Sequence, residues 1–248
     1  MKFSYLEYSN IIKHIQQYLD VVDFANVTSN SDNYCVVRHD VEFSPYRALE
    51  VAKLENNIGI SSSFYFQITN NCYNSLSNEN LAIIKQIEDL GHKIGAHINT
   101  SYIERVNKKE LSELVQDDVR TLSKYTGIDI NRYSFHRPTI EQLECYLEID
   151  GLINAYDKKF FYFCKENIPE ELPVTYLADS NHQWKWGYPI HLDFSKISKL
   201  QLNTHPFSWT NYGYGNINNY KSLVTEKNHE LVNSINNEIK NFPKELLL

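Results

Sequence analysis

The stretch VVRHDVEFSP at positions 36–45 places an apolar run directly against charged residues. Asp40 and Glu42 are two positions apart, so both carboxylates point to the same side if the chain is extended there. Two carboxylates on one face repel each other unless a cation lies between them or they perform different tasks. A divalent metal ion beside one carboxylate, with the other acting as a base, meets both conditions. The residues therefore indicate the chemistry of a metal-dependent hydrolase.

Ionisable residues also follow four further apolar segments of the chain. They are His97 near the end of segment 92–98, His136 and Arg137 at the end of 130–136, Asp179 after 174–178, and His205 after 200–204. In α/β barrels, active sites are built at the carboxyl ends of the strands. His97 and His136 could complete an N/O ligand set typical of zinc, with manganese, iron and nickel as alternatives. The pattern therefore predicts one polar site at one rim of a sheet.

Apolar strand-like segments alternate along the chain with segments of helical periodicity. Strands are expected at 34–38, 60–68, 92–98, 130–136, 152–156, 174–178 and 200–204, and helices after Ser44, after Ser77, and over 111–122, 139–149 and 224–242. Ser44 and Ser77 are typical helix N-caps, and Gly59, Gly91 and Gly127 are typical residues at or just past helix ends. This alternation predicts an α/β fold with a mainly parallel sheet covered by helices, either a barrel or an open sheet.

The chain contains no internal repeat, low-complexity tract or linker, so a single domain is expected. Residues 1–33 are interpreted as a helical N-terminal extension that closes one end of the fold. Residues 34–248 then form the barrel itself.

The composition limits the classes of partner. Lys and Arg together number 24 against 31 Asp and Glu, a net charge of −7 that argues against a nucleic-acid binder. No stretch approaches the roughly 20 apolar residues of a membrane span, and the N-terminus has no apolar core of signal-peptide length. Four scattered cysteines without a CxxC pair indicate free thiols in a reducing compartment. We therefore expect a cytoplasmic protein without a membrane span.

Five short motifs give the chain a specific resemblance. They are RHDVE at 38–42, GHKIGAH at 91–97, FHRP at 135–138, DSNHQW at 179–184 and THPFSW at 204–209. In this order they resemble the motifs of the polysaccharide deacetylase superfamily, the NodB-homology or carbohydrate esterase family four group. The resemblance spans about residues 34–210 and is strongest to a bacterial branch whose first motif reads R-H-D-V-D and which is often found with surface-polysaccharide biosynthesis. It implies a distorted (β/α) barrel, a divalent metal ion and N-deacetylation of a sugar, or less often deformylation or O-deacetylation.

The resemblance also implies a role for each matching residue. Asp40 would be the general base and His205 the general acid, Arg137 would orient the base, Glu42 and His97 would bind the metal ion, and Asp179 and Trp184 would line the cleft. The positions of Trp184 and Trp209 after strand ends also suggest a platform on which a sugar ring stacks. His39 would point away from Asp40 and is expected to be a packed, hydrogen-bonded core histidine.

The sequence departs from the family pattern in its metal motif. Glu42 replaces the usual Asp, Ser101 stands where a second histidine is usual, and Asn99 stands where an acid is found in the R-H-D-V-D branch. We take His136 as the third ligand because it ends a predicted strand and imidazole suits the metal ion. The amide oxygen of Asn99 is a weaker alternative.

These observations predict a zinc-dependent hydrolase that removes an acetyl or formyl group from a small-molecule or lipid-linked N-acyl sugar. Two alternatives stay open. The first is a catalytically decayed scaffold that binds or assembles glycans, which the residues at 99 and 101 motivate. The second is hydrolysis of an O-acyl ester, a reaction that depends less on a general acid.

Overall fold

The computed structural model of residues 1–248 describes the chain except for residues 1, 102, 104–106, 163–172, 244 and 246–248. None of the helices within the described residues is both long and apolar enough to cross a membrane. Cys35, Cys72 and Cys145 are free thiols, as expected, and Cys164 lies outside the described residues.

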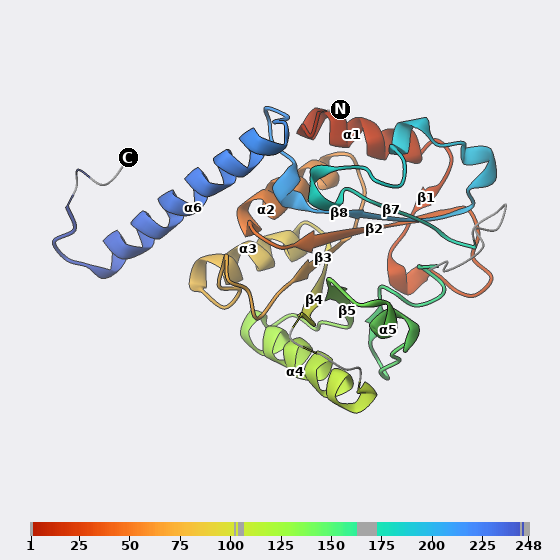
Figure 1. The fold of residues 1–248 in the computed structure, drawn as a ribbon, viewed down its shortest axis with the longest axis horizontal. Coiled ribbons are helices and arrows are strands. Elements are labelled where there is room, and N and C mark those ends of the chain that lie inside the picture. The colour runs from red at the N-terminus through yellow and green to blue at the C-terminus, as the bar shows by residue number, and fades with distance from the viewer. Residues whose placement is uncertain (1, 102, 104–106, 163–172, 244, 246–248) are drawn as a thin grey trace.

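A curled parallel sheet forms the centre of the molecule (Figure 1). Its strands are β1 (Asp20–Val21), β2 (Tyr34–Val41), β3 (Ser63–Phe66), β4 (Lys93–Asn99), β5 (Arg132–His136), β6 (Ile153–Asn154), β7 (Thr175–Ala178) and β8 (Lys199–Thr204). The strand order is β6-β5-β4-β3-β2-β8-β7, with β1 paired to the start of β2. Every pairing is parallel. The sheet is a half-barrel with flanking helices, which confirms the α/β, single-domain expectation and agrees with a distorted (β/α) barrel.

The helices that connect the strands pack on the outside of this sheet (Figure 1). The α-helices are α1 (Tyr5–Ile15), α2 (Pro45–Asn57), α3 (Asn78–Asp89), α4 (Lys108–Thr126), α5 (Ile140–Glu144) and α6 (Asn216–Glu238). Helix α6 follows the last strand and projects away from the sheet (Figure 1). In α4, Leu111, Val115, Val119 and Leu122 are buried at the three- and four-residue spacing that the sequence predicts. Each such side chain contributes on the order of 1.5–3 kcal/mol on full burial, so the apolar stripe holds the helix against the sheet.

The starts of α2 and α3 and the end of α4 lie where the local signals predict them. The Ser44 hydroxyl accepts a hydrogen bond from the backbone N–H of Arg47, and Ser77 caps α3 in the same way. Gly127 ends α4 with a φ of +73°, a left-handed conformation that costs glycine little. Each of these helices therefore ends where the chain turns back toward the next strand of the sheet.

Gly95, in the middle of β4, is required by close packing. A Cβ atom at this position would lie 2.4 Å from the ring of Tyr65 on β3 and 2.9 Å from the Arg132 side chain. The glycine of the GHKIGAH motif therefore makes room for large side chains inside the curled sheet, next to the strand end that carries His97.

Several elements differ in their bounds from the sequence prediction, and the short strand β1 is not predicted. The strand expected at 60–68 is limited to Ser63–Phe66, and the helix expected at 139–149 is limited to Ile140–Glu144. Helix α6 begins at Asn216, eight residues before its predicted start at Val224. Its first turns are tied to the body because Arg47 on α2 hydrogen-bonds the side chains of Asn219 and Glu226. These contacts join residues far apart in the sequence, so no local pattern predicts this start of α6.

Residues 1–33 supply α1 and β1. Tyr8, Ile11, Ile12 and Ile15 of α1 are buried in the main core, and β1 pairs with β2. The N-terminal segment is therefore helical, as expected, but it also contributes to the sheet. The domain boundary at residue 33 stays a prediction.

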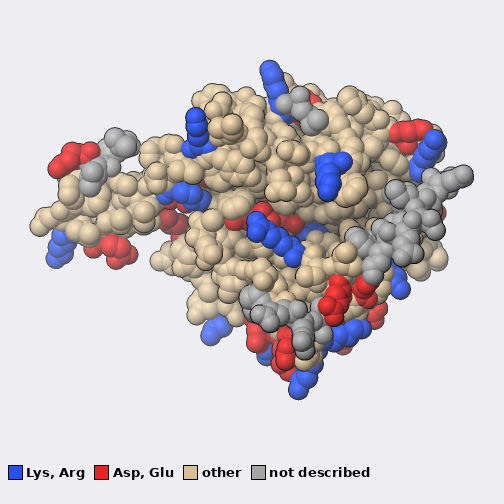
Figure 2. Space-filling model, viewed as in Figure 1, with Lys and Arg blue, Asp and Glu red and all other residues tan. Residues whose placement is uncertain are grey.

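Charged side chains of both signs are mixed over the face shown in Figure 2. The described residues on that face form no continuous basic surface of the kind that binds a nucleic-acid backbone.

Candidate active site

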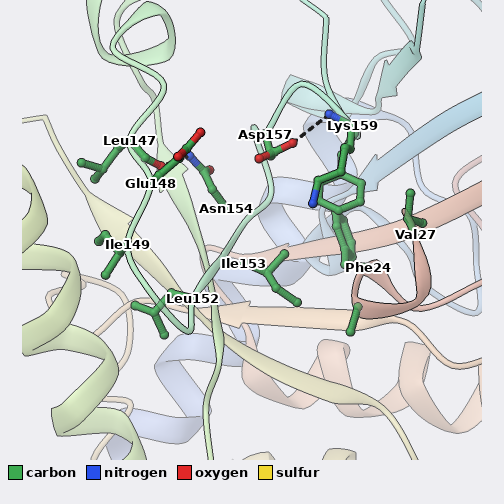
Figure 3. Close-up of a pocket in the computed structure, with 12 residues that line it drawn as sticks. Phe24, Val27, Leu147, Glu148, Ile149, Leu152, Ile153, Asn154, Asp157 and Lys159 are labelled. Atoms are coloured by element: carbon green, nitrogen blue, oxygen red, sulfur yellow. Dashed lines mark hydrogen bonds between the residues drawn. The ribbon is translucent and has the colours of Figure 1, made fainter. Parts of the chain in front are cut away.

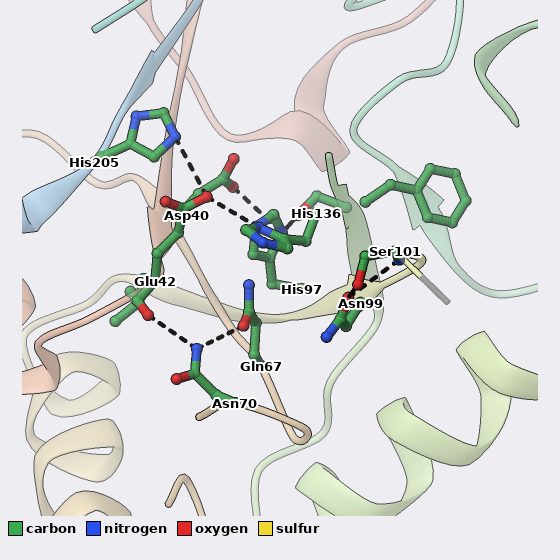
Figure 4. A network of polar contacts seen from close by, with 12 residues as sticks. Asp40, Glu42, Gln67, Asn70, His97, Asn99, Ser101, His136 and His205 are labelled. Atoms are coloured by element: carbon green, nitrogen blue, oxygen red, sulfur yellow. Dashed lines mark hydrogen bonds and ion pairs between the residues drawn. The ribbon is translucent and has the colours of Figure 1, made fainter. Parts of the chain in front are cut away.

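The carboxyl ends of four strands bring the predicted ionisable residues together (Figure 4). Asp40 lies in β2 and Glu42 directly follows it, His97 lies in β4, His136 ends β5, and His205 follows β8. In a parallel sheet all carboxyl ends lie at one edge, so residues far apart in the sequence meet there. The meeting of the acidic pair with three imidazoles is the spatial arrangement that the sequence predicted.

Asp40 is held by a buried arginine two residues before it. The Nε and Nη2 atoms of Arg38 each donate a 2.8 Å hydrogen bond to one carboxylate oxygen of Asp40. The amide of Asn203, the partner of Arg38 in the β2–β8 register, donates a further bond of 3.0 Å. Arg38 stacks on the ring of Tyr156, with the guanidinium carbon 4.5 Å from the ring centroid. The carboxylate therefore has a fixed orientation inside the half-barrel.

These contacts decide the charge of Asp40. Burial by itself raises the pKa of a carboxyl group, but the charge of Arg38, which contacts both carboxylate oxygens, outweighs it. The pKa of Asp40 is held far below its usual range, so the group is an anion at every ordinary pH.

Glu42, His97 and His136 form a cluster with the geometry of a metal site. One potential ligand atom from each lies within 4.8 Å of the others. Nδ1 of His136 is 2.9 Å from a carboxylate oxygen of Glu42. These three residues are the candidate metal ligands that the sequence predicts.

The imidazole of His97 is positioned to donate a nitrogen lone pair to a metal ion. Its Nδ1 is 2.7 Å from the hydroxyl of Ser134, its partner in the β4–β5 register, while Nε2 is buried and has no hydrogen-bond partner in the part of the chain that the structure describes. Burial lowers the pKa of His97 to about 4, so the ring is neutral near pH 7. A buried orphan nitrogen beside a carboxylate and a second imidazole fits a divalent cation, and this donor set suits zinc.

His205 is held by Asp179. The carboxylate oxygen Oδ1 of Asp179 lies 2.6 Å from Nδ1 of His205 and accepts the backbone N–H of the same residue at 2.9 Å. The other oxygen accepts the indole N–H of Trp209 at 2.8 Å. Burial lowers the pKa of His205, but its hydrogen bond to Asp179 outweighs this and raises it to about 9. His205 is therefore a cation near neutral pH, with Nε2 3.9 Å from Glu42.

The structure corrects the predicted role of Arg137. This side chain is exposed, and its backbone has a φ of +49°. The arginine that orients Asp40 is Arg38, which is on the same face of β2. The FHRP motif therefore contributes His136 to the cluster without its arginine.

The structure also corrects the three residues expected to contact a sugar. Asp179 is completely buried beneath His205, and Trp184 and Trp209 are 8% and 1% exposed in the core. Trp209 packs on Phe3 and Tyr8. An indole enclosed in this way cannot stack on a sugar ring, so both rings have a packing role here.

Two further expectations can be checked in the structure. The amide oxygen of Asn99 accepts hydrogen bonds from the backbone N–H and the hydroxyl of Ser101. The oxygen that was the alternative third metal ligand therefore already has hydrogen-bond partners. His39 is buried on the opposite face of β2, with Glu55 3.0 Å from Nε2 and Thr204 2.7 Å from Nδ1. His39 is thus the hydrogen-bonded core histidine that was expected.

The sequence analysis missed Arg38, Ser134, Asn203 and Gln67. Arg38 had a signal, because it lies two residues before Asp40 and so shares its face. Ser134 and Asn203 reach the site only through strand register, and no pattern in the sequence marks them. Gln67 follows β3, an element whose end had no ionisable residue.

A separate pocket of about 240 Å³ lies between the N-terminal segment and the β6 region (Figure 3). Phe24, Ile153 and Phe160 contribute apolar walls, and Glu148 and Asp157 contribute carboxylates. None of its lining residues belongs to the strand-end cluster, so this pocket is not part of the candidate active site.

No family model and no curated protein matches the sequence. Several solved structures are similar in fold. A chitin deacetylase from Colletotrichum lindemuthianum has 12% identity and a TM-score of 0.46, over 78% of this chain and 81% of that chain. A family 4 acetyl xylan esterase from Clostridium thermocellum, in complex with a cobalt ion, has 12% identity and a TM-score of 0.44, over 69% and 73%.

A CE4 family pseudoenzyme from Bacillus anthracis has 12% identity and a TM-score of 0.42, over 79% of this chain and 60% of that chain. The chain thus spans about three fifths of the pseudoenzyme's length. At these identities and scores the likeness concerns the general fold only, and the function has to be argued from the site itself.

Proposed function

We propose that this protein is a metal-dependent hydrolase that removes an N-acyl group from a sugar. The observation that carries the proposal is the meeting of a metal-ligand set with an anionic carboxylate and a cationic imidazole at one sheet edge. Glu42, His97 and His136 would hold the cation, Asp40 would serve as base, and His205 as acid. The motif resemblance supports an acyl sugar as the substrate class.

A divalent cation in this cluster supplies two effects, polarisation of an acyl carbonyl and a lowered pKa of a water molecule. The residues of the chain supply the remaining steps. Asp40 accepts the proton of the attacking water, and the two hydrogen bonds from Arg38 hold its carboxylate in one orientation. Because Arg38 also lowers the basicity of Asp40, the base is always ionised but intrinsically weak, so it depends on an acidified water.

His205 completes the reaction on the side of the leaving group. An amine leaves only if it is protonated, and His205 is a cation near neutral pH. Asp179 orients the ring through Nδ1, so that Nε2 faces the cluster. A neighbouring arginine keeps Asp40 deprotonated, and a neighbouring carboxylate keeps His205 protonated. The two groups can therefore act as base and acid at the same pH.

The finer features of the proposal follow the sequence motifs. We infer an acetyl or formyl group, a small-molecule or lipid-linked sugar, a role in bacterial surface-polysaccharide biosynthesis, and zinc as the metal ion. We also infer a cytoplasmic location from the cysteine usage, because scattered cysteines without a CxxC pair are typical of a reducing compartment.

The test is release of acetate or formate from a panel of N-acyl amino sugars, with zinc, manganese, nickel or iron(II) added to metal-free protein. Wild type should release the acid, and Asp40→Asn should lose at least a hundredfold in kcat. Equal release by both proteins would show that Asp40 is not the base. Glycan binding without metal uptake would favour the decayed, non-catalytic scaffold.

The ester alternative is separated by one variant. Alkoxide leaving groups need less help from an acid than amines do, so His205→Ala should strongly impair an amidase and affect an esterase much less. The comparison uses matched N-acetyl and O-acetyl sugars with the same metal-loaded protein.

A further inference from the structure

Gln67 presents an unused hydrogen-bond donor to the candidate active site. This residue follows β3, is 3% exposed, and its side-chain nitrogen Nε2 has no hydrogen-bond partner among the described residues. In Figure 4 that nitrogen points toward the rings of His97 and His136. An unpaired buried donor is destabilising, so one that faces a cluster of ionisable groups is a candidate for contact with a ligand.

A chain of hydrogen bonds fixes which end of the amide faces the site. The backbone N–H groups of Cys72 and Tyr73 donate to Oδ1 of Asn70. The amide nitrogen of Asn70 must therefore find acceptors, and it donates to the backbone carbonyl of Glu42 at 2.9 Å and to Oε1 of Gln67 at 2.5 Å. Because Oε1 is used as an acceptor, Nε2 must face the cluster. Gln67 is thus a donor in the site and not a metal ligand.

The backbone around Gln67 is fixed as firmly as its side chain. Its N–H donates to the hydroxyl of Tyr73 at 3.0 Å, and its carbonyl accepts from the hydroxyl of Ser75 at 2.5 Å. The Tyr73 hydroxyl in turn donates to the carbonyl of Val41, between Asp40 and Glu42. The loop that carries Gln67 is therefore tied to the strand end that carries both carboxylates.

We propose that Gln67 donates a hydrogen bond from Nε2 to the acyl oxygen of the substrate. This inference rests on the proposed function. A neutral donor held at a fixed place beside a cation site suits an oxygen that is partly negative as a carbonyl and more negative in the tetrahedral state. The same donor would bind a carboxylate oxygen of the released acid, so acetate is a simple probe of the ligand class.

The first measurement is acetate binding, followed through the side-chain NH₂ signals of Gln67 in ¹H–¹⁵N spectra of zinc-loaded protein. These signals are assigned by their loss in Gln67→Met, a substitution of similar shape. Acetate should shift them in wild type, and the variant should bind acetate about tenfold more weakly. Its zinc affinity, measured by calorimetry, should equal that of wild type.

The second measurement is kinetic. Gln67→Met should lower kcat about a hundredfold, the size of effect reported by removal of one oxyanion donor, with a smaller change in KM. Gln142→Met is the matched control, because Nε2 of Gln142 is also buried without a partner among the described residues, but the side chain of Gln142 belongs to the N-terminal capping box of α5. The control should keep wild-type kcat and acetate affinity.

The outcomes separate this inference from the proposed function. If wild type hydrolyses no acyl sugar but acetate still shifts the Gln67 signals, the function is wrong and the donor role stands. If hydrolysis is normal and a folded Gln67→Met protein keeps its kcat and acetate affinity, the donor role is wrong and the function stands. Loss of zinc affinity in that variant would also overturn the inference, because Gln67 would then act on the metal site.

Discussion

Arg38 and Asp40, two residues apart on β2, are joined by two parallel hydrogen bonds of 2.8 Å inside the half-barrel. A strand directs alternate side chains to one face, so the two groups are neighbours by their spacing alone. Their pairing is bidentate, the geometry in which a guanidinium both neutralises and orients a carboxylate. The side chain of Arg38 is 0% exposed. Burying an unpaired guanidinium is strongly unfavourable in free energy, and the pairing with Asp40 offsets that cost.

The first prediction concerns this pair. Arg38→Lys keeps a positive charge but loses the planar fork, so kcat/KM should fall by about 10- to 100-fold. The pKa of Asp40 should rise because burial is then less well offset, so an acid limb that lies below the measured pH range in wild type should enter that range in the variant. The measurement is kcat/KM between pH 4 and 8. Arg137→Lys is the control and should stay within twofold of wild type, whereas equal losses in both variants would contradict the assignment.

The second prediction concerns the alkaline limb of the pH profile. His205 has its pKa raised from 6.5 to about 9, so kcat should be level near neutral pH and fall as the pH passes about 9. Asp179→Asn removes the carboxylate that offsets burial, so the limb should move to lower pH. A profile that is the same in both proteins would show that His205 is not the acid.

The same group predicts a stability effect in metal-free protein. A raised pKa means that the folded state favours the protonated ring, so this stabilisation is complete below pH 6.5 and is lost as the pH rises through about 9. The loss should be on the order of 3 kcal/mol in the free energy of unfolding. Denaturant titrations of wild type and His205→Asn over pH 6 to 10 measure it, and the variant should lack this decline.

The third prediction concerns metal removal. Chelation should abolish hydrolysis and lower the melting temperature, and zinc at about 100 times its dissociation constant should restore roughly 2.7 kcal/mol of stability. Glu42→Gln and His97→Ala should each reduce zinc affinity at least tenfold in calorimetry. His229→Ala, at an exposed position of α6, is the control and should bind zinc as wild type does. Undiminished binding by Glu42→Gln would place the cation elsewhere.

The fourth prediction concerns the opposite face of β2. Glu55 on α2 is completely buried, lies 3.0 Å from His39, and accepts hydrogen bonds from Tyr8 and Ser62. Glu55→Ala leaves these partners unsatisfied and should cost about 3–5 kcal/mol, or roughly 10 °C in melting temperature. Calorimetric melting checks this value, with Glu50→Ala as the partly exposed control on the same helix. Zinc affinity should be unchanged in folded Glu55→Ala protein, because the network lies on the other face of the strand.

The sequence by itself determined the order of most elements, several helix ends and which ionisable residues follow the buried strands. These features have local causes. Periodic apolar residues, capping serines and terminal glycines act over a few positions. The rule that parallel strands end at one edge then brings Asp40, His97 and His205 together without any knowledge of register.

The tertiary structure decided which side chains support this cluster. Asn203 and Ser134 reach Asp40 and His97 through the registers of β2 with β8 and β4 with β5, which no local pattern records. Trp209 is the residue type that often stacks on sugar rings, but here it is buried, because Phe3 and Tyr8 of the N-terminal segment pack against it. A side chain's neighbours across the sheet depend on how the whole chain closes, so burial, partner and charge state emerge only from the folded protein.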